Sequence, residues 1–195
     1  WVVRQRGTKV SILQKRQAPI TIGGFPLPSD TPLFLAILDV HVAAGLTCVI
    51  AGIVAMISHK APGRHPRFGT LYFWGLGVVF ITMAVLAAMR WTQDYHLFIL
   101  GALSFAAAVV GRLAAPSRVT GRVHIHVTAM GLSYILLLTA FYVDNGKNLP
   151  LWRSLPPIAY WLIPVAIGVP LIVRVLLRHP LVQAERRSAQ AGGAA

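Results

Sequence analysis

The residues of this chain best suited to chemistry are its histidines, because a neutral imidazole can bind a metal ion or a haem iron. Four of them lie at or near the beginning of a long apolar run. If the chain crosses a membrane repeatedly, the first and third runs begin on one side and the second and fourth on the other. This alternation groups the histidines into two layers. One layer holds His41 and His96, and the other holds His65 and His126.

Two neutral imidazoles at one depth, on different helices, can bind a macrocycle from opposite faces. We therefore predict that His41 with His96, and His65 with His126, are haem iron ligands of two stacked sites. Two such layers would provide an electron path across the membrane. The expected cofactor is haem b, and a chlorophyll-type pigment is the alternative, since histidine binds both.

Glycines add a second pattern to these layers. A glycine follows each of the four histidines by about one helical turn: Gly45, Gly69, Gly101 and Gly131. A missing side chain one turn from a ligand leaves room for a flat ring. Gly45, Gly101 and Gly131 are therefore assigned to the predicted cofactor sites, although close helix packing also favours glycine in membrane helices.

Other roles for the histidines stay open. His59, His124 and His179 lie where interfacial residues bind headgroups or backbone carbonyls, and we interpret them in that way. His124 and His126 also form a His-x-His pair, which would need further ligands at the same face to bind a metal ion. Only His59 and His65 are candidates for those ligands.

Asp39 is the one acidic residue well inside an apolar run, and an intramembrane carboxylate is a functional candidate by default. It lies two positions from His41, so on a helix the two side chains point to different faces. Arg90 and the basic segment at the start of the chain are the possible partners. Asp39 is therefore a candidate for an ion pair or a proton relay.

The elements that position these residues are five apolar runs of about 20 to 25 residues, long enough for a helix to cross a hydrocarbon core. They cover 33–57, 70–89, 95–115, 123–143 and 158–177. We predict an all-α polytopic transmembrane bundle of five membrane helices. The fifth run carries no histidine and is expected outside a four-helix core. The predicted segments are a basic extramembrane segment 1–31, a transmembrane domain 32–178 and a tail 179–195.

Charge predicts the orientation of these helices. The chain has 18 lysines and arginines against 5 acids, a net charge of +13. Most basic residues lie between apolar runs, where they contact lipid headgroups rather than nucleic acid. The loops 58–69 and 116–122 and the tail carry the basic excess, which favours the cytoplasm. We expect a multi-pass protein of a bacterial inner membrane, with the N-terminus outside and the C-terminus in the cytoplasm.

Residues 1–30 do not follow this charge rule, because they are basic and lie on the expected outer side. A basic segment on the outer side runs against the usual charge bias of membrane proteins. This suggests that an acidic protein surface balances its charge. We therefore expect this segment to bind other membrane protein subunits. Besides Asp30, its charged residues are five cations: Arg4, Arg6, Lys9, Lys15 and Arg16.

Three stretches of the chain have a distinctive sequence: DVHVAAG around His41, RHPRFGTLYFW around His65, and SYILLLTAFYVDN after Met130. With them the chain resembles a family of bacterial integral membrane proteins of unknown function. The resemblance covers nearly everything after Pro32 and implies a small helical membrane protein, without an activity.

The histidine layers, more loosely, resemble those of four-helix di-haem b-type cytochromes. This second resemblance implies haem b and electron transfer across the membrane. Those cytochromes usually hold their ligands well inside the helices. His65 departs from that pattern, because it lies beside Pro66 and before its predicted span.

Three functions fit these observations. The first is an electron-transfer subunit with haem b or another tetrapyrrole. The alternative is a non-catalytic structural or accessory subunit of a larger membrane complex, in which the histidines are packing and interfacial groups. A transporter or proton-coupled channel that uses Asp39 and His41 ranks third, because no inverted repeat supports it. No nucleophile–base motif, phosphate loop or carboxylate pair in the sequence predicts hydrolase or kinase chemistry.

Overall fold

The computed structural model describes residues 21–22, 25–26, 32–59, 63–117 and 119–192. Five long helices follow one another: α1 (Pro32–Ile57), α2 (Arg64–Met89), α3 (Trp91–Ala114), α4 (Arg122–Asn145) and α5 (Pro157–Arg178). The shorter elements are the antiparallel strands β1 (Thr21–Ile22) and β2 (Phe25–Pro26), the 3-10 turn η1 (Gly146–Asn148) and the last helix α6 (Pro180–Gly192). Most of the N-terminal segment to which we assign protein partners lies outside the described residues.

All five long helices are long and apolar enough to cross a membrane, which confirms the all-α polytopic fold. Two of them begin earlier than predicted. α2 begins at Arg64 and α3 at Trp91, so that His65 and His96 are helical. The prediction that His65 precedes its helix was therefore wrong. Pro66 fits the first turn of α2, because an N–H at that position would have no partner within the helix.

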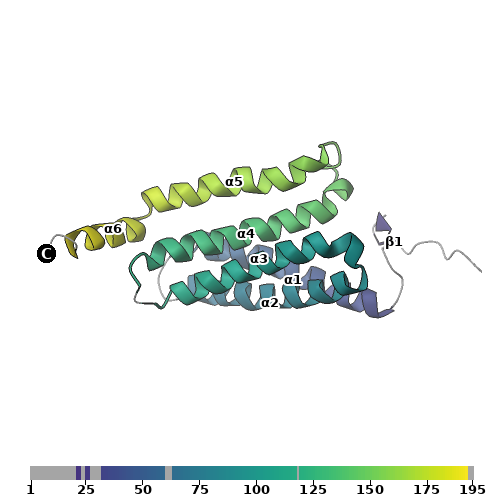
Figure 1. Ribbon diagram of the computed structural model, residues 1–195, viewed down its shortest axis with the longest axis horizontal. Coiled ribbons are helices and arrows are strands. Elements are labelled where there is room, and N and C mark those ends of the chain that lie inside the picture. The colour runs from purple at the N-terminus through teal and green to yellow at the C-terminus, as the bar shows by residue number, and fades with distance from the viewer. Residues whose placement is uncertain (1–20, 23–24, 27–31, 60–62, 118, 193–195) are drawn as a thin grey trace, which may run out of the picture.

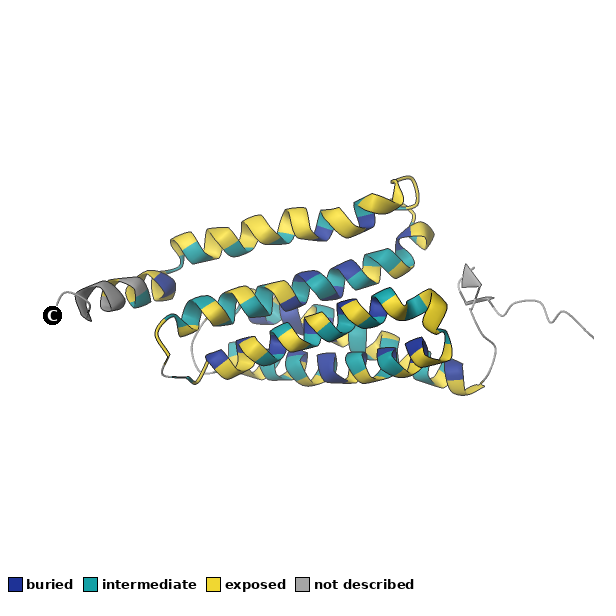
Figure 2. Ribbon diagram, in the orientation of Figure 1, coloured by how far each residue is buried: buried dark blue, intermediate teal, exposed yellow. Residues whose placement is uncertain are grey.

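Helices α1 to α4 form a four-helix bundle in which consecutive helices are neighbours and α1 meets α4 at a few positions (Figure 1). α5 packs mainly against α4 and lies outside this bundle, as predicted. Figure 2 shows a largely exposed surface along α5. That surface is apolar, as a helix in contact with lipid requires.

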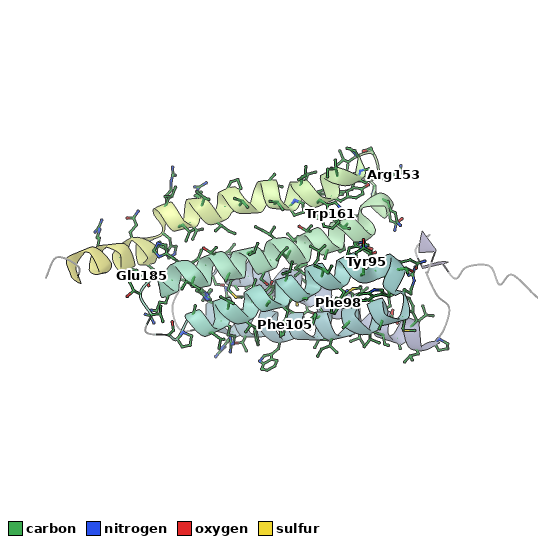
Figure 3. All side chains as sticks on the ribbon, viewed as in Figure 1. Tyr95, Phe98, Phe105, Arg153, Trp161 and Glu185 are labelled. Carbon is green, nitrogen blue, oxygen red and sulfur yellow. The ribbon has the colours of Figure 1, made fainter. Side chains whose placement is uncertain are left out.

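The bundle has two ends that carry different polar groups. At the η1 end lie the beginnings of α1 and α3 and the end of α4. At the α6 end lie the beginnings of α2 and α4 and the ends of α1 and α3 (Figure 1). α6 continues beyond this end, and its first turns contact α4, where Val182 is fully buried and Glu185 reaches the first turn of α4 (Figure 3).

The two hairpins of the bundle, α1–α2 and α3–α4, are equivalent to each other. Tyr72 and Leu76 on α2 correspond to Ser133 and Leu137 on α4, which lie 61 positions later. Residues of α1 also correspond to residues of α3 at a constant offset in sequence. Both helices bury small residues, which allow close helix contact. The corresponding buried positions are Cys48, Gly52 and Ala55 on α1 and Ser104, Ala108 and Gly111 on α3. The same pattern of residues and contacts thus recurs within each hairpin, whereas α2 packs more extensively against α3 than α1 does against α4.

Candidate functional site

Two of the predicted ligand histidines meet at the α6 end of the bundle. His65 lies in the first turn of α2, and His126 lies in the second turn of α4, the helix diagonally opposite. Their ring centroids are 6.1 Å apart and their ring planes are inclined by 78°. Both side chains are half-buried. The structure therefore brings together the second of the two predicted layers.

Each of these two rings is held by the backbone of the neighbouring helix in its own hairpin. His65 Nδ1 lies 2.9 Å from the carbonyl oxygen of Ala55, and His126 Nδ1 lies 2.7 Å from that of Gly111. A carbonyl only accepts hydrogen bonds, so the proton of each ring is on Nδ1 and the lone pair is on Nε2. This is the tautomer of a histidine that binds a metal through Nε2, with its other nitrogen bonded to a carbonyl.

The two carbonyl contacts are equivalent in the two hairpins, since Ala55 corresponds to Gly111 and His65 to His126. Each hairpin thus contributes one histidine of the pair, at corresponding positions. Sequence reasoning grouped the two histidines by depth, but it missed both carbonyls. The spacing of side chains along one helix says nothing about which backbone group of the next helix they face.

A second polar layer lies deeper in the bundle, two helical turns beyond His65. The hydroxyl groups of Tyr72 and Ser133 are 2.7 Å apart, and Ser104 Oγ donates to the carbonyl of Ser133 at 2.8 Å. In the other hairpin, the thiol of Cys48 donates to the carbonyl of Tyr72 at 3.6 Å. All four residues are buried. Sequence reasoning missed this layer, although the shared offset of Tyr72 and Ser133 from the two histidines could have revealed it.

At the η1 end, by contrast, the predicted pair His41 and His96 has separate surroundings. His41 Nδ1 lies 2.9 Å from Thr82 Oγ1 on α2. The ring of His96 contacts those of Tyr95 and Trp161, with the Trp161 centroid 6.4 Å away on α5. The two rings thus face different helices, and their ligation of one haem stays a prediction.

Asp39 is exposed on α1, and its predicted partner Arg90 has other contacts. Arg90 donates a hydrogen bond to Gln93 and lies over the ring of Phe34, 6.0 Å from its centroid. The other possible partner, the basic segment 1–30, falls almost wholly outside the described residues. Asp39 therefore stays a candidate without an assigned role.

The predicted glycines differ in what surrounds them. A Cβ atom at Gly131 would lie 2.7 Å from Ile172 of α5, so this glycine allows helix packing and leaves no room for a ring. A Cβ at Gly101 would make only ordinary contacts with Phe80 and Met83. Open space surrounds the Cβ position of Gly45 and also that of Gly69, one turn after His65.

The His-x-His alternative is not formed. His124 Nδ1 lies 2.9 Å from Glu185 Oε2 on α6, and the Val123 amide donates to Glu185 Oε1 at 3.3 Å. Partial burial raises the pKa of Glu185, but the hydrogen bonds from His124 and Val123 outweigh it, and the net pKa is lowered. Within the part of the chain that the structure describes, no three His, Cys, Asp or Glu side chains cluster as metal ligands.

No protein-family model, curated protein or solved structure matches the chain. The class of this protein is therefore assigned from its fold and its candidate site alone. It is a polytopic helical membrane protein whose bundle consists of two equivalent hairpins. A pair of histidines, one from each hairpin, lies at one end of that bundle.

Proposed function

We propose that this protein is a membrane electron-transfer protein that holds a metallo-tetrapyrrole of the b-haem class between His65 and His126. The observation that carries the proposal is the geometry of the pair. Both rings have their proton fixed on Nδ1 by a carbonyl, and their centroids are 6.1 Å apart. Nitrogen ligands about 2.0–2.1 Å from an ion on its opposite sides place two imidazole centroids about 6 Å apart.

The donor set and its surroundings fit this class of cofactor. Two neutral imidazoles, those of His65 and His126, would hold the haem iron through Nε2. The open space at the Cβ position of Gly69 adjoins His65 on α2. On the α4 side, the side chain of Met130 lies against Gly111. Methionine is flexible enough to repack around a ring.

When bound, the haem supplies a one-electron redox couple, and the residues of the chain set its environment. His65 and His126 would hold the metal, while Ala55 and Gly111 keep both rings in the ligating tautomer through their carbonyls. The buried layer around Tyr72 separates this end from the η1 end. With the orientation predicted from charge, the site lies toward the cytoplasmic side of a bacterial inner membrane.

A titration of the purified protein with ferric haem tests the proposal. We expect the wild type to give the sharp Soret band and the low-spin electron paramagnetic resonance signal of bis-imidazole iron. His65→Ala and His126→Ala should each weaken binding by more than the roughly 10- to 100-fold that loss of an outer-shell partner costs. His41→Ala and His96→Ala are the matched controls, and they should keep the spectrum and the affinity.

The outcomes of this titration separate the alternatives. A wild-type protein whose spectrum never changes with added haem contradicts the proposal. Loss of the spectrum in the two control variants alone would move the site to the η1 end. A magnesium chlorin that binds in place of haem would assign the site to pigment instead. Circular dichroism of each variant confirms that the helices are retained.

A further inference from the structure

Arg112 lies in the last turn of α3, at the end of the bundle that holds the histidine pair, and makes two side-chain contacts. It follows Gly111, whose carbonyl accepts the hydrogen bond of His126. Its Nη1 donates to Thr70 Oγ1 at 3.1 Å, which joins α3 to α2. Its Cζ atom lies 5.3 Å from the centroid of the Phe73 ring, within the range of a cation–π contact.

The neighbours of this arginine belong to the same site. Thr70 directly follows Gly69, whose Cβ position is open and which lies one turn after His65. A guanidinium group has five N–H donors in a planar fork that matches a carboxylate, and the bond to Thr70 uses one of them. Arg112 and the Thr70 hydroxyl therefore offer hydrogen-bond donors for a carboxylate at the end of the bundle that holds the histidine pair.

We propose that Arg112 and Thr70 bind a propionate carboxylate of the tetrapyrrole, an inference that rests on the proposed function. A tetrapyrrole with ionised side arms needs a cation at the edge of its site, because a bare carboxylate is costly near hydrocarbon. Arg112 supplies that cation in the last turn of α3, on the side of the bundle where α2 and α3 meet. The corresponding position in the first hairpin is Met56, so that hairpin has no arginine there.

A simpler role for Arg112 is to anchor the helix end in the headgroup layer, as terminal arginines often do. The two roles differ in their ligand, a haem propionate in one case and a lipid phosphate in the other. Haem and its dimethyl ester separate them, since the ester keeps the ring and the metal but has no carboxylate. Phosphatidylcholine nanodiscs remove anionic lipid from the comparison.

The test measures the dissociation constants of haem and haem dimethyl ester for the wild type, Arg112→Gln and Arg112→Lys. Arg174→Gln on α5 is the matched control, because Arg174 is exposed near the same end of the bundle. Loss of a hydrogen-bonded charge typically corresponds to about 10- to 100-fold in affinity. We expect the wild type to prefer haem by about this factor, and Arg112→Gln to lose that preference without weaker binding of the ester. Arg112→Lys should keep part of the preference, and Arg174→Gln all of it.

Each result decides between the roles. A wild type that binds haem and its ester equally well keeps the proposed function and overturns the propionate site. A preference for haem that survives in Arg112→Gln also overturns it. A wild type that binds neither compound rejects the proposed function itself. Unchanged binding of the ester by Arg112→Gln shows that this variant is folded.

Discussion

The two hairpins of the bundle agree at the α6 end and in its middle, and they differ at the η1 end. The carbonyl contacts of His65 and His126 are equivalent, and so are those of Cys48 and Ser104 in the next layer. The contact between His41 and Thr82 has no such counterpart, because Leu97 and Val143 occupy the corresponding positions of the second hairpin.

This difference shows where a site formed by one residue from each hairpin can lie. Where the two hairpins share the same contacts, a histidine at one position can be matched by a histidine at the corresponding position, as His65 is by His126. Among the corresponding positions of the two hairpins, histidine occurs in both hairpins only at the α6 end. His41 and His96 come from the two hairpins too, but from non-equivalent positions, and their rings face different helices.

The largest effect is expected where the shared pattern of small residues is broken. A Cβ atom at Gly52 would collide with the ring of Tyr134, with Cδ2 at 2.7 Å, and that ring is held by a hydrogen bond from its hydroxyl to the Val49 carbonyl at 3.1 Å. Gly52→Ala should therefore lower the free energy of unfolding by about 1–3 kcal/mol, the usual cost of overpacking. Titration of unfolding with sodium dodecyl sulfate in mixed micelles measures it.

Gly45→Ala on the same helix is the matched control for this substitution. Its Cβ would have no neighbour within 4 Å, so the loss of backbone freedom in the unfolded chain should make it neutral or slightly stabilising. Equal destabilisation by the two alanines would show that α1 and α4 do not meet at Gly52.

A smaller effect is expected in the middle layer, where Tyr72 joins the two hairpins. Tyr72→Phe removes its hydrogen bond to Ser133, which is fully buried. Hydrogen bonds between membrane helices contribute about 0.6 kcal/mol on average and up to about 1.7 kcal/mol. The same unfolding titration should show a loss in this range. Tyr95→Phe, on an exposed ring, should cost less, and a reversed order of the two variants would argue against the layer.

The smallest effect concerns the hydrogen bonds of Glu185 on α6 with the first turn of α4. The pKa of Glu185 is lowered from 4.5 in the folded state by hydrogen bonds that outweigh its partial burial. A lowered carboxyl pKa means that this tie is fully present above pH 4.5 and is lost as the pH falls through the lower, folded-state value. We therefore expect α6 to leave α4 in acid while the five long helices stay folded.

The distance between spin labels at Val119 and Gln183, two exposed positions, measures the docking of α6. It should lengthen or broaden below pH 4.5. Glu185→Gln should reproduce that change at neutral pH, and Arg187→Gln should not. A distance that stays constant from pH 7 to pH 3 would mean that the burial of Val182 holds α6 without help from the carboxylate.

The fold could be predicted from the sequence because the length of an apolar run is a strong constraint in lipid. The position of α5 outside the bundle could also be predicted, because the fifth apolar run contains no histidine. The rotation of each helix about its axis could not be predicted, since it depends on which small residues meet. Gly131 illustrates this: it lies near His126 in sequence, but it faces Ile172 on α5. The pairing of His65 with His126 could be predicted, because it depends on depth along the membrane. The contact of His41 with Thr82 could not, because it depends on the rotation of the helices.

The equivalence of the two hairpins also bears on how such a chain could arise and insert during synthesis. A unit of two crossings returns the chain to the side from which it started. A gene segment encoding one hairpin can therefore be copied in tandem without reversing the orientation of either copy, and one set of insertion signals serves both. The basic loops before α2 and before α4 then emerge on the same face of the membrane. α5, as a single additional crossing, is the element that places the two termini of the helical domain on opposite sides.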